Sequence, residues 1–91
     1  MSNPISTSPL SPNNISTTKK ASETTGQWIA RHNESVCSST PVGNTLTTTW
    51  TSSNGPQSTV SNRKAGESDR EFIYRHMNEF LVAASEEPPI P

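Results

Sequence analysis

Two histidines are the residues whose type and spacing could carry chemistry in this chain. His32 and His76 each follow an arginine, and each lies four residues after an aromatic side chain. Imidazole can bind metals and transfer protons near neutral pH, so a facing pair could hold a metal ion or relay protons. The alternative is structural: each ring packs at the edge of an apolar helix face, with one polar tip satisfied.

The sequence lacks the further residues that metal binding or catalysis needs. Zinc takes three or four ligands, and Cys37, the single cysteine, stands five residues from His32. No base lies at a recognisable spacing from Cys37 or from a serine, and no G-x-S-x-G motif occurs. We expect no enzyme activity, no bound metal and no cofactor, and one cysteine cannot form an intrachain disulfide.

The basic residues give a second candidate site. Six of the seven stand in matched places, and together with the two histidines they form the candidate binding set. The set is Lys19, Lys20, Arg31, His32, Arg63, Lys64, Arg75 and His76. Cation pairs at the entrance to a helix favour phosphate, because free amides and the helix dipole add to their charge. Alternatively the cations offset nearby acids, and the two helix arginines pair with Glu34 and Glu79.

The matched places come from an internal repeat. Residues Lys20–His32 read KASETTGQWIARH and residues Lys64–His76 read KAGESDREFIYRH, with six identities in 13 positions. A repeat fixes the unit of construction, so we expect two like units at about 13–41 and 44–88. A rotation near a half turn should then bring His32 onto His76, with similar burial of the two rings.

Both copies predict a helix. In each copy a hydroxyl residue is followed three positions later by Gln or Glu, which is the spacing of a capping box. The pairs are Thr24 with Gln27 and Ser68 with Glu71. Apolar residues then recur at helical spacing, which predicts helices at Thr25–Ser38 and Asp69–Ser85 with one buried stripe each. Glu23 and Glu67 precede the caps and suit the positive end of each helix.

A hairpin is predicted between the two helices. The segment Asn44–Ser52 alternates between two faces and is rich in β-branched threonine, which suits a strand. Its inward face is Leu46, Thr48 and Trp50. Asn54 and Gly55 both tolerate positive φ and supply the turn. The return strand is predicted at Gln57–Arg63, with Val60 facing inward.

The first unit is expected to carry a decayed copy of that hairpin. With one gap in the alignment Ile15 falls opposite Val60, so Ile15–Lys19 is predicted as a short strand. Residues 1–12 are rich in Ser, Thr, Asn and Pro and are expected to form a disordered tail. Residues 13–88 are expected to form one small domain, followed by a tail at 89–91.

The predicted fold is therefore α+β: a small duplicated β-β-α unit with pseudo-twofold symmetry, whose antiparallel sheet carries two helices on one face. The predicted core is Trp28, Ile29, Val36, Leu46, Trp50, Val60, Phe72, Ile73, Met77, Phe80 and Leu81. Ser and Thr make up 27 of the 91 residues, so this core is small and of marginal stability. We expect either a thinly stable monomer or a dimer that shares its core.

The overall composition limits the function. The net charge is −1, no apolar run is long enough to span a membrane, and no signal-peptide pattern follows Met1. We expect a small cytoplasmic interaction protein without catalysis, which binds a protein partner or a second copy through the edge of the Thr-rich hairpin. Nucleic-acid or phosphate binding through the basic pairs is the alternative, and no small-molecule substrate is inferred.

Overall fold

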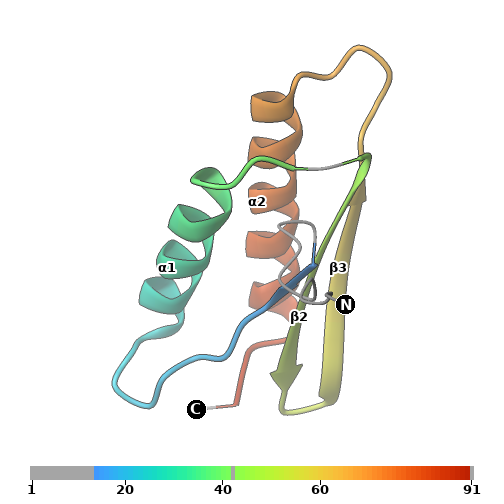
Figure 1. Cartoon of the computed structure of the whole chain (residues 1–91). Coiled ribbons are helices and arrows are strands. Elements are labelled where there is room, and N and C mark those ends of the chain that lie inside the picture. The colour runs from blue at the N-terminus through green and yellow to red at the C-terminus, as the bar shows by residue number, and fades with distance from the viewer. Residues whose placement is uncertain (1–13, 42, 91) are drawn as a thin grey trace, which may run out of the picture.

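The part of the chain that the structure describes folds as a three-stranded mixed sheet covered on one face by two helices (Figure 1). The computed structural model describes residues 14–41 and 43–90. Their elements are β1 at Asn14–Ser16, α1 at Thr25–Cys37, β2 at Thr45–Ser52, β3 at Gly55–Asn62 and α2 at Asp69–Glu86. The expected α+β class is confirmed, and the expected tail at residues 1–12 lies outside the described residues.

The middle strand of the sheet is β2. β3 pairs with it in antiparallel fashion, with Thr48 opposite Thr59, as the predicted hairpin requires. β1 pairs with its other side in parallel, with Ile15 opposite Thr48, so the prediction of an antiparallel sheet was wrong for β1. The reason is the connection: β1 reaches β2 by way of α1, and such a crossover joins parallel strands. The described residues before α1 hold one strand, so the hairpin expected there is not formed among them.

The hairpin turn lies one residue earlier than predicted. Ser53 and Asn54 form the turn, and Gly55 already opens β3. Gly55 has φ of +110°, a value that L side chains rarely adopt, whereas Asn54 does not take a positive φ. Pro56 follows on β3, at the edge of the sheet where the lack of an N–H does no harm.

Both helices begin where their capping boxes predicted. Thr24 Oγ1 accepts from the Gln27 amide at 3.1 Å, and the Gln27 side chain accepts from the Thr24 amide at 2.8 Å. Ser68 and Glu71 make the same two bonds, at 3.1 and 2.9 Å. The predicted ends differ from the observed ends by one residue in each helix.

The core lies between the helices and the inner face of the sheet. One cluster contains Trp28, Ile29, Trp50, Phe80 and Ala84, and the other contains Val36, Leu46, Phe72 and Ile73. Met77 is half-buried against the second cluster. The predictions for Val60 and Leu81 were wrong, because their side chains are 54% and 44% exposed. Thr59 and Ser61 face inward in place of Val60, since a shift of one residue turns every strand side chain to the other face.

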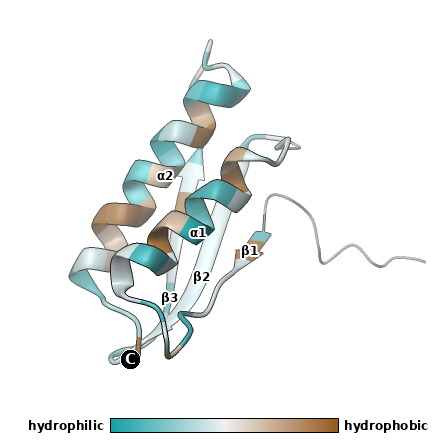
Figure 2. Cartoon of the chain, turned by 90° about the vertical axis from the view of Figure 1, so that its left-hand side faces the viewer, coloured by the Kyte–Doolittle hydropathy of each residue, from teal (hydrophilic) through white to brown (hydrophobic). Residues whose placement is uncertain are grey.

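Among the described residues, no helix lies over the outer face of the sheet (Figure 2). Its β2 side chains are four threonines at alternate positions, and most of β2 is pale on the hydropathy scale. Residues 89–90, expected as a tail, lie beside β2: Pro89 bridges Ser52, and the Ile90 amide donates to the Thr51 carbonyl at 3.3 Å. No helix among the described residues is long and apolar enough to cross a membrane.

Candidate functional site

The two histidines meet at one threonine in the centre of the molecule. His32 comes from α1, His76 from α2 and Thr48 from the middle strand, and all three side chains are buried. Thr48 Oγ1 lies 2.9 Å from His32 Nε2 and 2.8 Å from His76 Nε2. The two ring centroids are 6.3 Å apart. A single hydroxyl therefore links the two helices and the sheet.

The outer nitrogens of the two rings are also hydrogen-bonded. His32 Nδ1 lies 2.9 Å from Asn33 Oδ1, and His76 Nδ1 lies 2.7 Å from Ser61 Oγ. Ser61 in turn donates to Glu79 Oε1. The expectation that each ring sits at the edge of an apolar stripe with one tip satisfied was wrong, because both nitrogens of both rings have partners. The aligned repeat predicted similar burial of the two rings, and they are 2% and 0% exposed.

Burial keeps both imidazoles neutral near neutral pH. It lowers the pKa of His32, with a smaller opposing effect from the hydrogen bond to Asn33. It also lowers the pKa of His76 to about 4, and the positive charge on a protonated His32 acts in the same direction. The described residues contain no group of three side chains that could hold a metal ion, so the pair has no further ligands there.

Each helix is tied to the chain before it by an arginine that clamps a glutamate. Arg31 Nε lies 2.6 Å from Glu23 Oε2, and Arg31 Nη2 lies 2.9 Å from Oε1 and 2.8 Å from the Thr18 carbonyl. The same glutamate accepts from the Lys20 amide at 2.8 Å. The planar guanidinium group donates two hydrogen bonds to the two carboxylate oxygens, which gives a bidentate ion pair of fixed geometry. We call this set the first clamp.

The second clamp repeats these contacts 44 residues later. Arg75 donates to both oxygens of Glu67 at 2.8 Å and to the Asn62 carbonyl at 2.5 Å, and Glu67 accepts from the Lys64 amide at 3.0 Å. The arginine hydrogen bonds lower the pKa of Glu23 and of Glu67 to about 2. Arg75 also reaches Glu79 at 3.1 Å, as predicted.

The arginine partners were only partly predicted. Arg31 pairs with Glu23 instead of Glu34, and the acids before the caps hold arginines in addition to facing the helix ends. The signal was present in the repeat, because a glutamate and the arginine eight residues after it are identical in both copies.

The basic pairs before the helices are less free than the phosphate hypothesis needs. Arg63 forms an ion pair with Asp69 at 2.8 Å, and its guanidinium lies 4.6 Å from the centre of the Phe72 ring. Three lysines, Lys19, Lys20 and Lys64, have no salt bridge among the described residues. The candidate set therefore divides into a buried pair, three paired arginines and three surface lysines.

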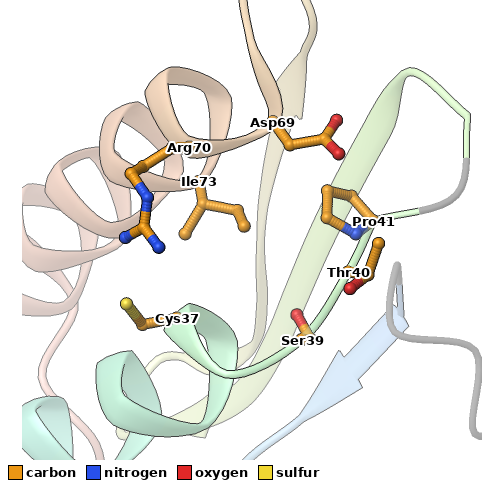
Figure 3. Close-up of a pocket in the computed structure, with 7 residues that line it drawn as sticks. All are labelled: Cys37, Ser39, Thr40, Pro41, Asp69, Arg70 and Ile73. Carbon is orange, nitrogen blue, oxygen red and sulfur yellow. The ribbon is translucent and has the colours of Figure 1, made fainter.

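A shallow pocket of about 190 Å³ lies between the end of α1 and the start of α2 (Figure 3). Figure 3 shows the Arg70 side chain pointing across it toward Cys37. Arg70 also donates to the Tyr74 hydroxyl at 2.8 Å, and the acid in the pocket, Asp69, is held by Arg63. Its charged groups thus already have partners, and the geometry gives no reactive arrangement around the thiol.

The outer edge of β3 is the remaining feature that could bind a partner. The Arg63 amide donates to the Asn44 carbonyl at 2.7 Å, which fixes the odd-numbered residues of β3 as those bonded to β2. The N–H and C=O groups of Ser58 and Val60 therefore point away from the sheet. Among the described residues, no strand pairs with this edge.

The structure brings forward residues that the sequence did not single out for a site. Asn33 and Ser61 complete the bonding of the two rings, and Thr48, predicted to face inward, connects them. A buried hydroxyl between two apolar inward positions of β2 was the available signal. No family model, no curated protein and no solved structure matches this chain.

Proposed function

We propose that this protein is a small non-enzymatic interaction module that binds an extended segment of another protein, or of a second copy, along the outer edge of β3. The observation that carries the proposal is that edge itself. It is eight residues long, contains no charged residue, and directs free backbone groups outward at Ser58 and Val60. Exposed strand edges of this kind add a further strand, with main-chain hydrogen bonds supplying affinity.

The contrast with the opposite side of β2 supports this choice of edge. There β1 pairs with residues Thr47–Thr49, and beyond β1 the segment at Pro89 and Ile90 continues along the same side. Natural sheets commonly protect an edge with charges, a proline, a covering segment or a very short strand, and β3 has Pro56 near its start. β3 has none of these along its middle among the described residues. Val60 adds an apolar side chain, 54% exposed, on the outer face beside the free backbone groups.

A synthetic peptide with the sequence of β3, residues 55–62, is a defined probe for this edge. We expect it to slow the amide hydrogen exchange of Ser58 and Val60 in the ¹⁵N-labelled full chain, and we expect the chain to self-associate at high concentration in light scattering. Ser58→Pro removes an outward N–H that the β2 ladder does not use, so it should abolish both effects while the fold remains. Ser16→Pro on β1 is the matched control at the other edge.

Two results would count against the proposal. One is unchanged exchange at Ser58 and Val60 at saturating peptide, together with a monomer at every concentration. The other is equal binding by the Ser58→Pro variant, which would move the binding surface away from this edge.

The alternative, phosphate or nucleic-acid binding through the basic residues before the helices, has less support. Three of the arginines already form ion pairs with acids of the same protein: Arg31, Arg63 and Arg75. Three surface lysines remain for a polyanion. A filter-binding series with duplex DNA at rising salt separates the two ideas. If the lysines bind phosphates, a plot of the logarithm of the affinity against the logarithm of the salt concentration falls with a slope of about 0.9 for each phosphate contact.

We also propose that the chain is an internal duplication with pseudo-twofold symmetry, in which the repeated unit is one strand followed by one helix. The two units would be β1 with α1 and β3 with α2, and β2 would lie on the axis. The register supports this: Ile15 and Thr59, which are 44 residues apart, both lie opposite Thr48, one in parallel and one in antiparallel pairing. A half turn about an axis through Thr48, perpendicular to the sheet, would exchange two such strands.

A further inference from the structure

We propose that the buried chain of hydrogen bonds from Asn33 to Glu79 is a binding site for one proton. We further propose that the Asn33 side-chain amide group rotates by 180° when the proton is taken up. The chain runs through five bonds: Asn33 to His32, His32 to Thr48, Thr48 to His76, His76 to Ser61, and Ser61 to Glu79. It crosses the core from one half-buried residue on α1 to another on α2.

Counting hydrogens gives the argument. Each of the five bonds uses one hydrogen. Two neutral imidazoles and two hydroxyls supply four, one each. At one end the Asn33 carbonyl oxygen faces His32, and at the other end Glu79, which also accepts from Arg75, presents a carboxylate oxygen to Ser61. Both ends accept, so the arrangement in the structure needs a fifth hydrogen, and an imidazolium supplies it.

The fifth hydrogen can belong to either ring. If His32 is charged, it donates to Asn33 and to Thr48, and the Thr48 hydroxyl donates to His76. If His76 is charged, it donates to Thr48 and Ser61, and the Thr48 hydroxyl donates to His32. Transfer of the His32 Nε2 proton to Thr48 Oγ1, with transfer of the Thr48 hydroxyl proton to His76 Nε2, converts the first state into the second. The two rings act as one site, and their titration belongs to the pair.

The neutral chain has its own complete arrangement. When the Asn33 amide is turned by 180°, its NH₂ group donates to His32 Nδ1. His32 then donates from Nε2 to Thr48, Thr48 donates to His76 Nε2, and His76 donates from Nδ1 to Ser61. All five bonds are again made, now with no added proton. The two charge states thus differ in one added proton on the ring pair and in the orientation of one amide.

The hydrogen-bond chain cannot accommodate a second added proton. Two imidazolium rings would both direct Nε2–H at Thr48 Oγ1, which leaves the Thr48 hydroxyl hydrogen without an acceptor. Two like charges would also lie 6.3 Å apart in the core. The first proton is therefore compatible with the fold, whereas the second opposes it.

Burial and the surrounding charges set the pH range in which the histidine pair takes up a proton. Arg31 on α1 and Arg75 on α2 disfavour a charged ring, and Glu79 on α2 favours it. β2 and β3, which pack against the rings, carry no charged residue. Burial is the largest influence and lowers the pKa of both histidines, so uptake occurs in the acidic range below 6.5. Asn33 and Glu79, the two ends of the hydrogen-bond chain, are half-buried, so solvent can reach both of them.

The test is a side-chain ¹⁵N NMR titration of the full-length chain from pH 7.5 to pH 4. At pH 7.5 we expect opposite tautomers, with the ring proton on Nε2 of His32 and on Nδ1 of His76. On acidification the rings should take up one proton in a shared step while the amide spectrum stays native. The Asn33 side-chain NH₂ signal should shift with the same midpoint.

Two variants sharpen the test. Asn33→Asp places an acceptor that cannot turn into a donor, so it should raise the midpoint of uptake by at least one pH unit. Ser35→Asp puts the same charge on an exposed position of α1 and should raise it much less. Identical tautomers at pH 7.5, an Asn33 signal that ignores the titration, two protons bound by the native fold, or equal shifts in the two variants would overturn the proposal.

Discussion

The two halves of this molecule make the same local contacts but end differently at the sheet. In both halves a capping box starts the helix, a Glu–Arg clamp ties it to the preceding chain, and an aromatic residue and an isoleucine are buried. In the sheet, however, the residue opposite Thr48 is Ile15 in the first half and Thr59 in the second half. Thr59 Oγ1 is buried and has no hydrogen-bond partner among the described residues. The local contacts are alike in both halves, whereas the residues opposite Thr48 differ in chemical type.

The largest effect that can test this comparison is loss of the repeated aromatic residue. Trp28→Ala and Phe72→Ala should each cost about 3–5 kcal/mol, because both side chains are fully buried. Total stability near 5 kcal/mol is typical of a small domain, so either variant should be largely unfolded. Urea unfolding and NMR dispersion measure this, with Tyr74→Ala, half exposed, as the control. Native dispersion in one variant and unfolding in the other would break the equivalence of the halves.

The clamps come next. Arg31→Gln should raise the pKa of Glu23 from about 2 toward its usual range and leave that of Glu67 at about 2, and Arg75→Gln should do the reverse. Because each folded-state pKa lies below the unfolded value, the stability from a clamp is present above pH 4.5 and is lost as the pH falls toward 2. Carboxyl ¹³C NMR measures each pKa. A response of both glutamates to one substitution would show that the clamps are not independent.

The histidines contribute in a different pH window. Their folded-state pKa values lie below the usual 6.5, so the folded chain binds protons less readily than the unfolded chain. Stability is therefore intact above pH 6.5 and falls as the pH drops from 6.5 toward the value of about 4 for His76. Urea midpoints between pH 7.5 and pH 4 should show this fall before the clamps begin to titrate. A midpoint constant down to pH 4.5 would contradict it.

The smallest effect concerns the difference between the halves. Thr59→Val keeps the shape of the side chain and removes a buried hydroxyl for which the described residues supply no partner. Since an unsatisfied buried polar group costs about 1–3 kcal/mol, this variant should be more stable by roughly 1 kcal/mol. Urea unfolding measures the change. A loss of stability would mean that the Thr59 hydroxyl has a partner and that the two sheet positions are less different than described.

The features that the sequence predicted correctly are those that depend on short stretches of residues. The caps and both helices follow from residues within a few positions of each other, and they are confirmed. The inward residue of β3 depends on register, and a shift of one position made the prediction for Val60 wrong. The parallel pairing of β1 joins residues 33 positions apart, which no local pattern encodes. The site at Thr48 was missed for the same reason, since three separate elements bring its hydroxyl and the two rings together.

The Thr48 hydroxyl is the group that connects both halves through their histidines. Thr48→Val removes that hydroxyl, and Thr49→Val changes the neighbouring threonine on the other face of β2. In side-chain ¹⁵N NMR we expect Thr48→Val to shift the signals of both His32 and His76, and Thr49→Val to leave both where they are. A Thr48→Val spectrum in which one ring or neither ring changes would contradict the central link between the two halves.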